Sequence, residues 1–216
     1  MADCCTATLD AQFDAHSAEQ QLREFRRNGP SKETQLLSLA LRDAGIDGAT
    51  LLDIGGGIGA VQAEAFRDGV VRALSVDASS GYVDAARSLA AERGYLDRVE
   101  YRVGDFVDVV DSIPAVDVVT LDKVICCYAD MHALVSRSAG RARRLYAAVF
   151  PRDGLPIRAA SGVHNAFRRL TRSSFRTYIH RSSAIEGVLA RHGFRLRSMA
   201  TTMIWRITVF ERTEPE

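Results

Sequence analysis

The stretch LLDIGGGIGA, which runs from Leu51 to Ala60, decides the fold. It is an apolar run interrupted by one acid, Asp53, and four of its last six residues are glycine. Glycine adopts left-handed backbone conformations and carries no side chain, so such a turn lets a ligand lie against bare backbone. If a helix follows, its free N–H groups face the same ligand. The stretch therefore predicts a strand, a nucleotide-binding turn and a helix.

The same glycines fit two different spacings. Gly55, Gly57 and Ala60 match G-x-G-x-x-A, the dinucleotide pattern. Gly55, Gly57 and Gly59 match G-x-G-x-G, which is typical of loops that bind S-adenosylmethionine. The first spacing indicates hydride transfer and the second indicates methyl transfer, and the glycines alone leave both open.

Around this stretch, short apolar segments alternate with segments of helical length. This alternation predicts an α/β protein with a doubly wound, mostly parallel sheet and helices on both faces. The last two apolar segments follow each other too closely for a crossover helix, so we expect them to form an antiparallel hairpin. The expected strands are 50–55, 73–78, 99–106, 116–124, 145–151, 194–203 and 204–212, and the expected helices are 13–27, 34–45, 59–69, 80–94, 131–144 and 182–193.

Composition narrows the class of protein. A chain of 216 residues suits one domain, and a formal net charge of +1 argues against general nucleic-acid binding. No apolar run reaches membrane-spanning length and residues 1–14 lack the features of a secretory signal, so we expect a cytoplasmic protein. The cysteines form two adjacent pairs, Cys4–Cys5 and Cys126–Cys127, without the spacing of zinc ligands. We therefore expect reduced thiols and no metal.

Acidic residues at three strand ends favour S-adenosylmethionine, which carries a cationic sulfonium, over a dinucleotide. Asp53 precedes the loop, where a carboxylate disfavours pyrophosphate but suits a cationic sulfonium and α-amino group. Asp77 ends the second strand and is placed to accept hydrogen bonds from both ribose hydroxyls, although NAD sites use an acid in the same way. Asp105 ends the third strand, where it is placed to accept from an adenine amino group while Phe106 covers the ring.

Taken together, LLDIGGGIG, LSVDAS and VGDF resemble the cofactor motifs of class I S-adenosylmethionine-dependent methyltransferases over residues 50–123. TLDKVICCYAD resembles a segment of a bacterial group of these enzymes whose acceptors are mostly unassigned. More distantly, the chain is similar to magnesium-protoporphyrin and quinone-biosynthesis methyltransferases. The resemblance implies a seven-stranded sheet with its last strand reversed, S-adenosylmethionine as cofactor and S-adenosylhomocysteine as product.

The resemblance also implies a set of cofactor-binding residues. Gly55, Gly57 and Gly59 would line the cofactor, Asp53 would support its amino-acid end, and Asp77 would hold the ribose. Ala78, Asp105 and Phe106 would surround the adenine. Tyr82 would either lean on the adenosyl group or pack in the core.

Beyond the fourth strand lie the candidates for chemistry. Because ligands bind at the carboxyl ends of parallel strands, the segment from Asp122 to His132 is expected to reach the acceptor. Asp122, Tyr128 and His132 are the candidates for positioning the acceptor or removing its proton. The thiols of Cys126 and Cys127 suggest metalloid binding as a less favoured alternative, since a third thiolate would have to come from Cys4 or Cys5.

We expect one domain in four parts. Residues 1–48 form part of the acceptor pocket, 49–153 bind the cofactor, 154–182 form a lid-like insertion, and 183–216 form the last helix and hairpin. The insertion mixes arginines with apolar residues, so it is expected to attract an anionic or amphipathic small-molecule acceptor, to rest on a membrane surface, or simply to be a solvated helix. Alternative functions are an NAD(P)-dependent oxidoreductase and a non-catalytic S-adenosylmethionine-binding protein. We expect a monomer or homodimer.

Overall fold

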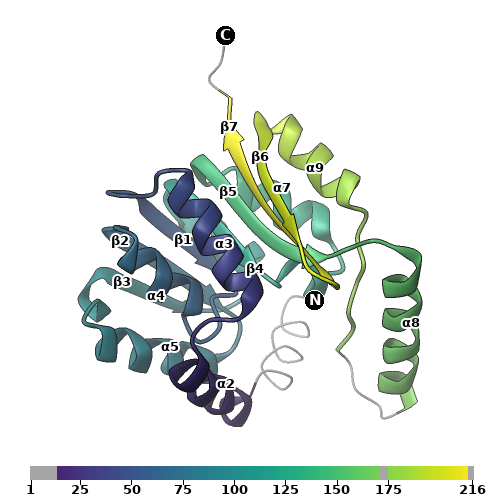
Figure 1. The fold of residues 1–216 in the computed structure, drawn as a ribbon, viewed down its shortest axis with the longest axis horizontal. Helices are drawn as coiled ribbons and strands as arrows, with labels where there is room; N and C mark the ends of the chain where they lie inside the picture. The colour runs from purple at the N-terminus through teal and green to yellow at the C-terminus, as the bar shows by residue number, and fades with distance from the viewer. Residues whose placement is uncertain (1–13, 171–174, 214–216) are drawn as a thin grey trace.

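The computed structural model describes residues 14–170 and 175–213. Helices and strands alternate along the chain (Figure 1). The α-helices are α2 (Ala15–Asn28), α3 (Lys32–Asp43), α4 (Ala60–Arg67), α5 (Ser80–Arg93), α6 (Phe106–Val109), α7 (Met131–Ala139), α8 (Leu155–Leu170) and α9 (Ser182–Arg191). The strands are β1 (Thr50–Ile54), β2 (Arg72–Asp77), β3 (Val99–Val103), β4 (Val116–Asp122), β5 (Ala142–Pro151), β6 (Phe194–Thr201) and β7 (Trp205–Arg212). Short 3₁₀ turns lie at Leu96–Arg98, Val110–Ser112 and Ile125–Cys127.

The strands form one seven-stranded sheet in the order β3-β2-β1-β4-β5-β7-β6. Neighbouring strands from β3 to β5 are parallel, whereas β7 pairs antiparallel with both β5 and β6. The predicted fold class is therefore confirmed. The strand order reverses between β1 and β4, and in open α/β sheets ligands bind at such a switch point, beyond the carboxyl ends of the strands.

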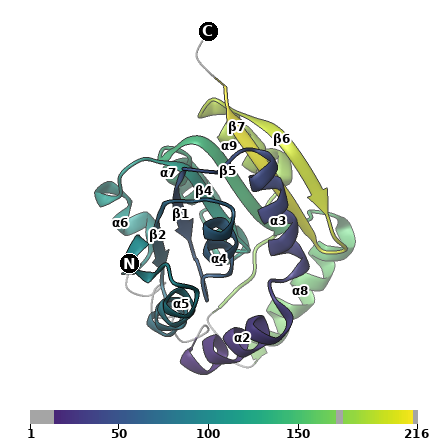
Figure 2. The same ribbon diagram turned by 60° about the vertical axis from the view of Figure 1, so that its left-hand side comes forward.

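Helices cover both faces of the sheet because side chains alternate along each strand. Leu51 of β1 packs in the core beneath α3, α4 and α5, whereas Leu52 packs in the core beneath α6, α7 and α9. On the outside of α5 lies α2, whose Leu22 and Phe25 are buried against it (Figure 2). This contact brings α2 next to the loop after β1. No described helix is long and apolar enough to cross a membrane.

Three predicted boundaries differ from the structure by three residues or more. The third strand ends at Val103 rather than at residue 106, and Phe106 begins α6. The helix predicted over 131–144 ends at Ala139, and the fifth strand starts at Ala142 rather than at residue 145. Arg143 and Arg144 are exposed strand residues, so they lack the apolar pattern by which a buried strand is predicted. Phe13, at the start of the first predicted helix, and the pair Cys4–Cys5 lie outside the described residues.

Candidate active site

A cavity of about 630 Å³ lies at the switch point, between the loop after β1, the ends of β2 and β4, and α2. Among the described residues its charged lining is mostly acidic, with Glu24, Asp53, Asp77 and Asp122 against one cation, Lys123. No described arginine lines the cavity, although the chain is rich in arginine. Such a lining suits a cationic ligand and disfavours a pyrophosphate.

Three glycines give the loop its shape. Gly55, Gly57 and Gly59 have φ angles of +62°, +54° and +80°, which only glycine adopts without strain. Gly55 and Gly57 line the cavity. Gly59 instead is the N-cap residue of α4 and packs against Ala86, where an added Cβ would lie 3.4 Å from the Ala86 methyl group. Its role is therefore to join the loop to the helix rather than to line the cavity.

Beneath this loop lies a buried polar network around Asp53. The carboxyl group accepts hydrogen bonds from Thr120 Oγ1 at 2.7 Å and from Gln62 Nε2 at 3.0 Å, and the residue is only 1% exposed. Gly56 covers the network so closely that a Cβ there would lie 2.6 Å from Ser75 Oγ and 2.9 Å from Asp53 Oδ2. Asp53 thus supports the loop from below.

Sequence reasoning did not single out Gly56. Its signal is the run of three consecutive glycines, whose middle member neither of the two spacings requires. Gln62 and Thr120 were also missed, because nothing in their own segments shows that they share a carboxylate.

Burial raises the pKa of Asp53 to about 7, which makes stability depend on pH. The folded chain then binds more protons than the unfolded chain between about pH 4 and pH 7, so the free energy of unfolding falls as pH rises through this window. We expect this contribution to be about 1 kcal/mol per pH unit. Asp53→Asn cannot titrate, so its urea-unfolding free energy should change less than that of the wild type between about pH 5 and pH 7. Parallel pH profiles for the two proteins would contradict this assignment.

At the end of β2, Asp77 is held by backbone on both sides. Its Oδ2 accepts from Gly57 N and its Oδ1 from Ser79 N, each at 2.9 Å. Ala78 and Tyr82 also line the cavity, and the Tyr82 hydroxyl accepts a hydrogen bond from Gln21 Nε2 of α2 at 2.6 Å. This bond joins α2 to the wall beside the glycine loop.

Asp105 and Tyr128 meet at the next wall of the cavity. Asp105 caps α6 by accepting from Val107 N at 2.9 Å, and its Oδ1 also accepts from the Tyr128 hydroxyl. Phe106 and Tyr128 line the cavity, whereas Asp105 lies behind them. Asp105, which is predicted to contact the adenine, therefore already accepts hydrogen bonds from the protein at Oδ1.

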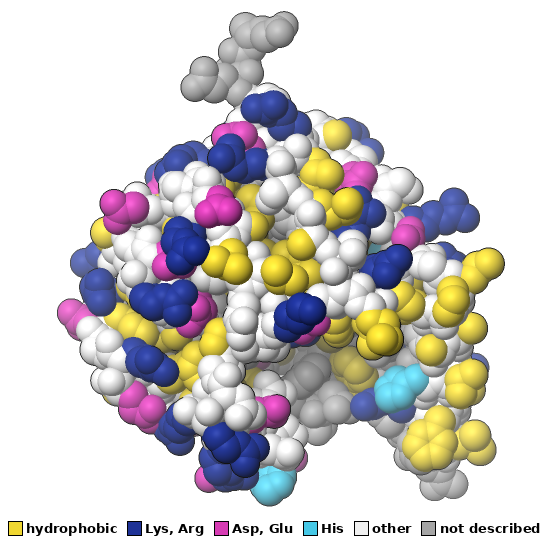
Figure 3. All heavy atoms as spheres, viewed as in Figure 1, with side chains coloured by type: hydrophobic (Ala, Val, Ile, Leu, Met, Phe, Trp, Pro, Cys, Tyr) yellow, Lys and Arg dark blue, Asp and Glu magenta, His cyan; other side chains and the backbone are white. Residues whose placement is uncertain are grey.

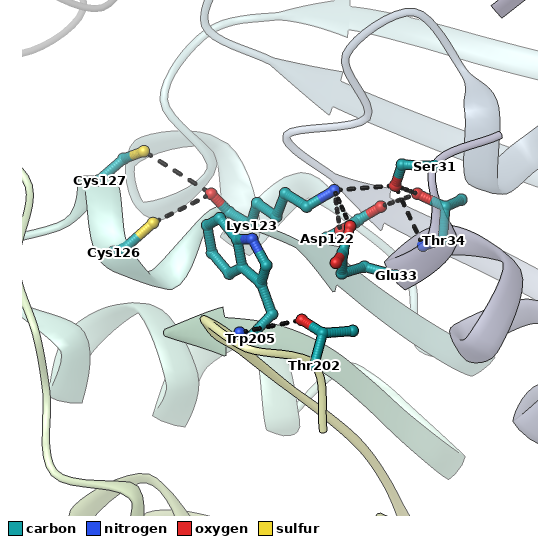
Figure 4. Close-up of polar contacts among 9 residues, drawn as sticks. All are labelled: Ser31, Glu33, Thr34, Asp122, Lys123, Cys126, Cys127, Thr202 and Trp205. Atoms are coloured by element: carbon teal, nitrogen blue, oxygen red, sulfur yellow. Dashed lines mark hydrogen bonds and ion pairs between the residues drawn. The ribbon is translucent and has the colours of Figure 1, made fainter. Parts of the chain in front are cut away.

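The end of β4 carries a cluster around Lys123 (Figure 4). Lys123 has a φ of +65°, the only positive value for a non-glycine residue in the described ranges. Its ammonium group donates to Ser31 Oγ at 3.0 Å and lies 3.7 Å from Glu33 Oε2. It also lies 5.6 Å from the centre of the Trp205 ring. Lys123 thereby ties β4 to the start of α3 and to β7.

Next to this lysine, Asp122 has one satisfied and one unsatisfied oxygen. Thr34 Oγ1 donates to Oδ2 at 2.6 Å, whereas the buried Oδ1 has no hydrogen-bond partner among the described residues. Lys123 Nζ is 3.8 Å from Oδ1, which is an ion-pair distance but too long for a hydrogen bond. A buried acceptor of this kind is costly unless a ligand or water donates to it.

The structure does not bring every predicted residue to the cavity. His132 lies in the first turn of α7 with an exposed side chain and is absent from the lining, which this segment leaves after Tyr128. No residue of α8 lines the cavity either. Only the segment after α8 comes near: Tyr178 N donates to Cys126 O at 2.8 Å, and His180 Nε2 lies 2.8 Å from Tyr128 O.

The two described thiols lie on the same turn. Both Cys126 and Cys127 donate to Lys123 O, at 3.3 and 3.8 Å. No group of three or more potential metal ligands occurs in the described part of the chain.

The profile of the O-methyltransferase domain family matches residues 8–139, more than half of the sequence. The chain belongs to this family, and the predicted class of S-adenosylmethionine-dependent methyltransferase is confirmed. No protein of curated function matches the sequence.

Solved structures agree in fold. Magnesium protoporphyrin IX methyltransferase from Synechocystis PCC 6803, with bound SAH, is 21% identical with a TM-score of 0.68, covering 84% of this chain and 82% of that one. An O-methyltransferase family protein from Burkholderia thailandensis is 18% identical with a TM-score of 0.71, covering 95% and 63%. Geranyl diphosphate C-methyltransferase from Streptomyces coelicolor A3(2) is 17% identical with a TM-score of 0.66, covering 84% and 79%.

The cavity fits the methyl donor of this class. The left-handed glycines leave room for close approach, the Asp77 carboxylate stands at the end of β2, and the lining is predominantly acidic. A sulfonium and an α-amino group are both cationic, so they are favoured here over the pyrophosphate of a dinucleotide. The NAD(P)-dependent alternative is therefore set aside.

Proposed function

We propose that this protein methylates an oxygen atom of a small-molecule acceptor that binds between α2, the start of α3 and the end of β4. The family supports oxygen as the methylated atom. The location rests on Asp122, which lines the cavity at the end of β4 and whose buried Oδ1 accepts no hydrogen bond from a described residue. An acceptor hydroxyl that enters the cavity beside Asp122 would be a donor to this carboxyl group.

Different residues would bind the methyl donor and the acceptor. Gly55, Gly57 and Asp77 would hold the donor, and Asp53 would keep their loop in place from below. S-adenosylmethionine, when bound, supplies a methyl group already activated on a sulfonium. Asp122 would orient the acceptor hydroxyl and accept its proton, because methyl transfer depends mainly on alignment.

Tyr128 would act as a positioning residue, since its hydroxyl donates to Asp105 rather than into the cavity. Residues from Gln21 to Thr34 would form the opposite wall of the acceptor pocket. Because His132 lies outside the lining, it has no part in this proposal.

Replacing Asp122 with asparagine is expected to lower kcat by at least about tenfold, because the charge that orients the acceptor hydroxyl and accepts its proton is lost. The affinity for S-adenosylmethionine should change little. The measurement is formation of S-adenosylhomocysteine with a panel of phenols, carboxylic acids and amines. Asp108→Asn, at an exposed site on α6, is the matched control.

Two outcomes would contradict the proposal. The first is turnover with amines but with no oxygen acceptor. The second is unchanged kcat in Asp122→Asn with an oxygen acceptor. Calorimetry that gives heat with NAD but none with S-adenosylmethionine or S-adenosylhomocysteine would overturn the donor assignment as well.

A further inference from the structure

Helix α8 turns its apolar side chains towards solvent. Leu155, Val163, Phe167 and Leu170 are 83%, 72%, 64% and 82% exposed. None of the helix's 16 residues is buried. Figure 3 shows these apolar side chains gathered on the helix at the edge of the molecule. A helix of a globular protein normally directs such a face towards the core.

The opposite, polar side of α8 is the side fastened to the protein. Asn165 Nδ2 donates to Thr177 O at 2.7 Å, and Thr177 N donates back to Asn165 Oδ1 at 3.0 Å. Ser161 Oγ also donates to Thr177 O, at 3.3 Å. These bonds fix which way the helix faces, so the outward apolar stripe follows from the fold.

The same segment is strongly basic. Between residues 154 and 185 there are six arginines and no Asp or Glu, whereas the whole chain has a net charge of only +1. On α8 itself, Arg158 and Arg169 are exposed and, by helical periodicity, border the apolar stripe. What covers this surface must therefore be both apolar and anionic.

We propose that α8 docks on the surface of a bilayer that contains anionic lipids, with its apolar stripe in the acyl boundary and its arginines among the headgroups. Such a surface supplies an apolar medium and negative charge together. A second copy of α8 would supply the apolar contact but would bring arginines near arginines with no acid between them. Charge complementarity thus favours lipid over self-association.

Docking would place the bilayer near the acceptor side of the cavity. The chain that returns from α8 passes the site, where Tyr178 N donates to Cys126 O. The docking surface itself lies apart from the cavity, since no α8 residue lines it. The inference consequently stands independently of the proposed oxygen acceptor.

Co-sedimentation with vesicles tests the inference. The full chain should bind to vesicles of phosphatidylcholine mixed with phosphatidylglycerol. It should bind much less to vesicles of phosphatidylcholine alone. The double variant Val163→Ser with Phe167→Ser should lower the partition coefficient at least about tenfold, because two apolar side chains no longer enter the bilayer. Leu39→Ser with Val71→Ser, at two apolar sites that are each 45% exposed elsewhere, should bind as the wild type does.

Variants that remove positive charge separate electrostatic attraction to the headgroups from insertion of the apolar side chains. Arg158→Gln with Arg169→Gln should reduce binding to phosphatidylglycerol vesicles and weaken its salt dependence, whereas Arg72→Gln, at an exposed site on β2, should not. S-adenosylmethionine binding should be unchanged in all these variants.

Absence of wild-type binding to anionic vesicles would overturn the inference, as would equal binding to both lipid mixtures. Light scattering that shows a dimer dissociated by Val163→Ser with Phe167→Ser, together with no vesicle binding, would assign the stripe to a second copy instead.

Discussion

Replacing Asp77 with alanine is expected to weaken the binding of S-adenosylmethionine by about a hundredfold, which corresponds to two lost charge-assisted hydrogen bonds. The carboxylate would hold the ribose hydroxyls, and it also shapes the site, because it accepts from Gly57 N and Ser79 N. The alanine variant loses both effects. Calorimetric titration with S-adenosylmethionine measures the change directly.

Two further variants separate the causes. Asp77→Asn keeps one acceptor oxygen and should lose less affinity than the alanine variant. Asp84→Ala removes an exposed carboxylate from α5 and should bind as the wild type does. If Asp77→Ala retained wild-type affinity while remaining folded, the ribose assignment would be wrong.

Gly55→Ala is expected to have the second large effect, which lowers stability, cofactor binding or both. Gly55 has a φ of +62°, which costs a residue with a Cβ about 1–2 kcal/mol. The added Cβ would also lie 2.5 Å from Val124 Cγ2, inside van der Waals contact. Valine is stiff at χ1, so either the loop or Val124 must move. We expect a loss of roughly 2–5 kcal/mol in stability, in cofactor binding or in both.

The chain offers a control for each part of this cost. Gly45 has a φ of +77°, and a Cβ added there would have no neighbouring atom within 4 Å, so Gly45→Ala carries the backbone strain alone. Adding Val124→Ala to Gly55→Ala removes the steric part and should restore part of the loss. Thermal unfolding and calorimetry of the four proteins, wild type included, measure both quantities. Equal effects of Gly45→Ala and Gly55→Ala would show that the contact with Val124 is unimportant.

Much of the fold follows from local patterns. The alternation of strands and helices, the antiparallel end and the left-handed glycines all depend on neighbouring residues in the chain. The position of Asp77 at a strand end follows from the same patterns, because parallel strands end at a common edge. The start of β5 does not follow from these patterns, because Arg143 and Arg144 are exposed strand residues and carry no apolar signal.

The partners of the site residues follow from no such pattern. Asp122 meets Thr34 across 88 positions of sequence, and Lys123 meets Ser31 across 92. His132 lies near Asp122 in sequence but outside the cavity lining, because the chain leaves the cavity after Tyr128 and enters α7. Only packing of the distant helices against the sheet decides which side chains face one another.

The stretch from Leu51 to Ala60 depends on both local sequence and tertiary packing. By itself, LLDIGGGIGA determined the strand, the left-handed turn and the helix that follows, since these depend on backbone freedom within ten residues. Only the tertiary structure decided that Asp53 lies beneath the loop, that Gly56 must lack a Cβ, and that α8 faces outward. Those outcomes depend on volume and hydrogen bonds shared with Ser75, Gln62 and Thr177, which the chain brings together only on folding.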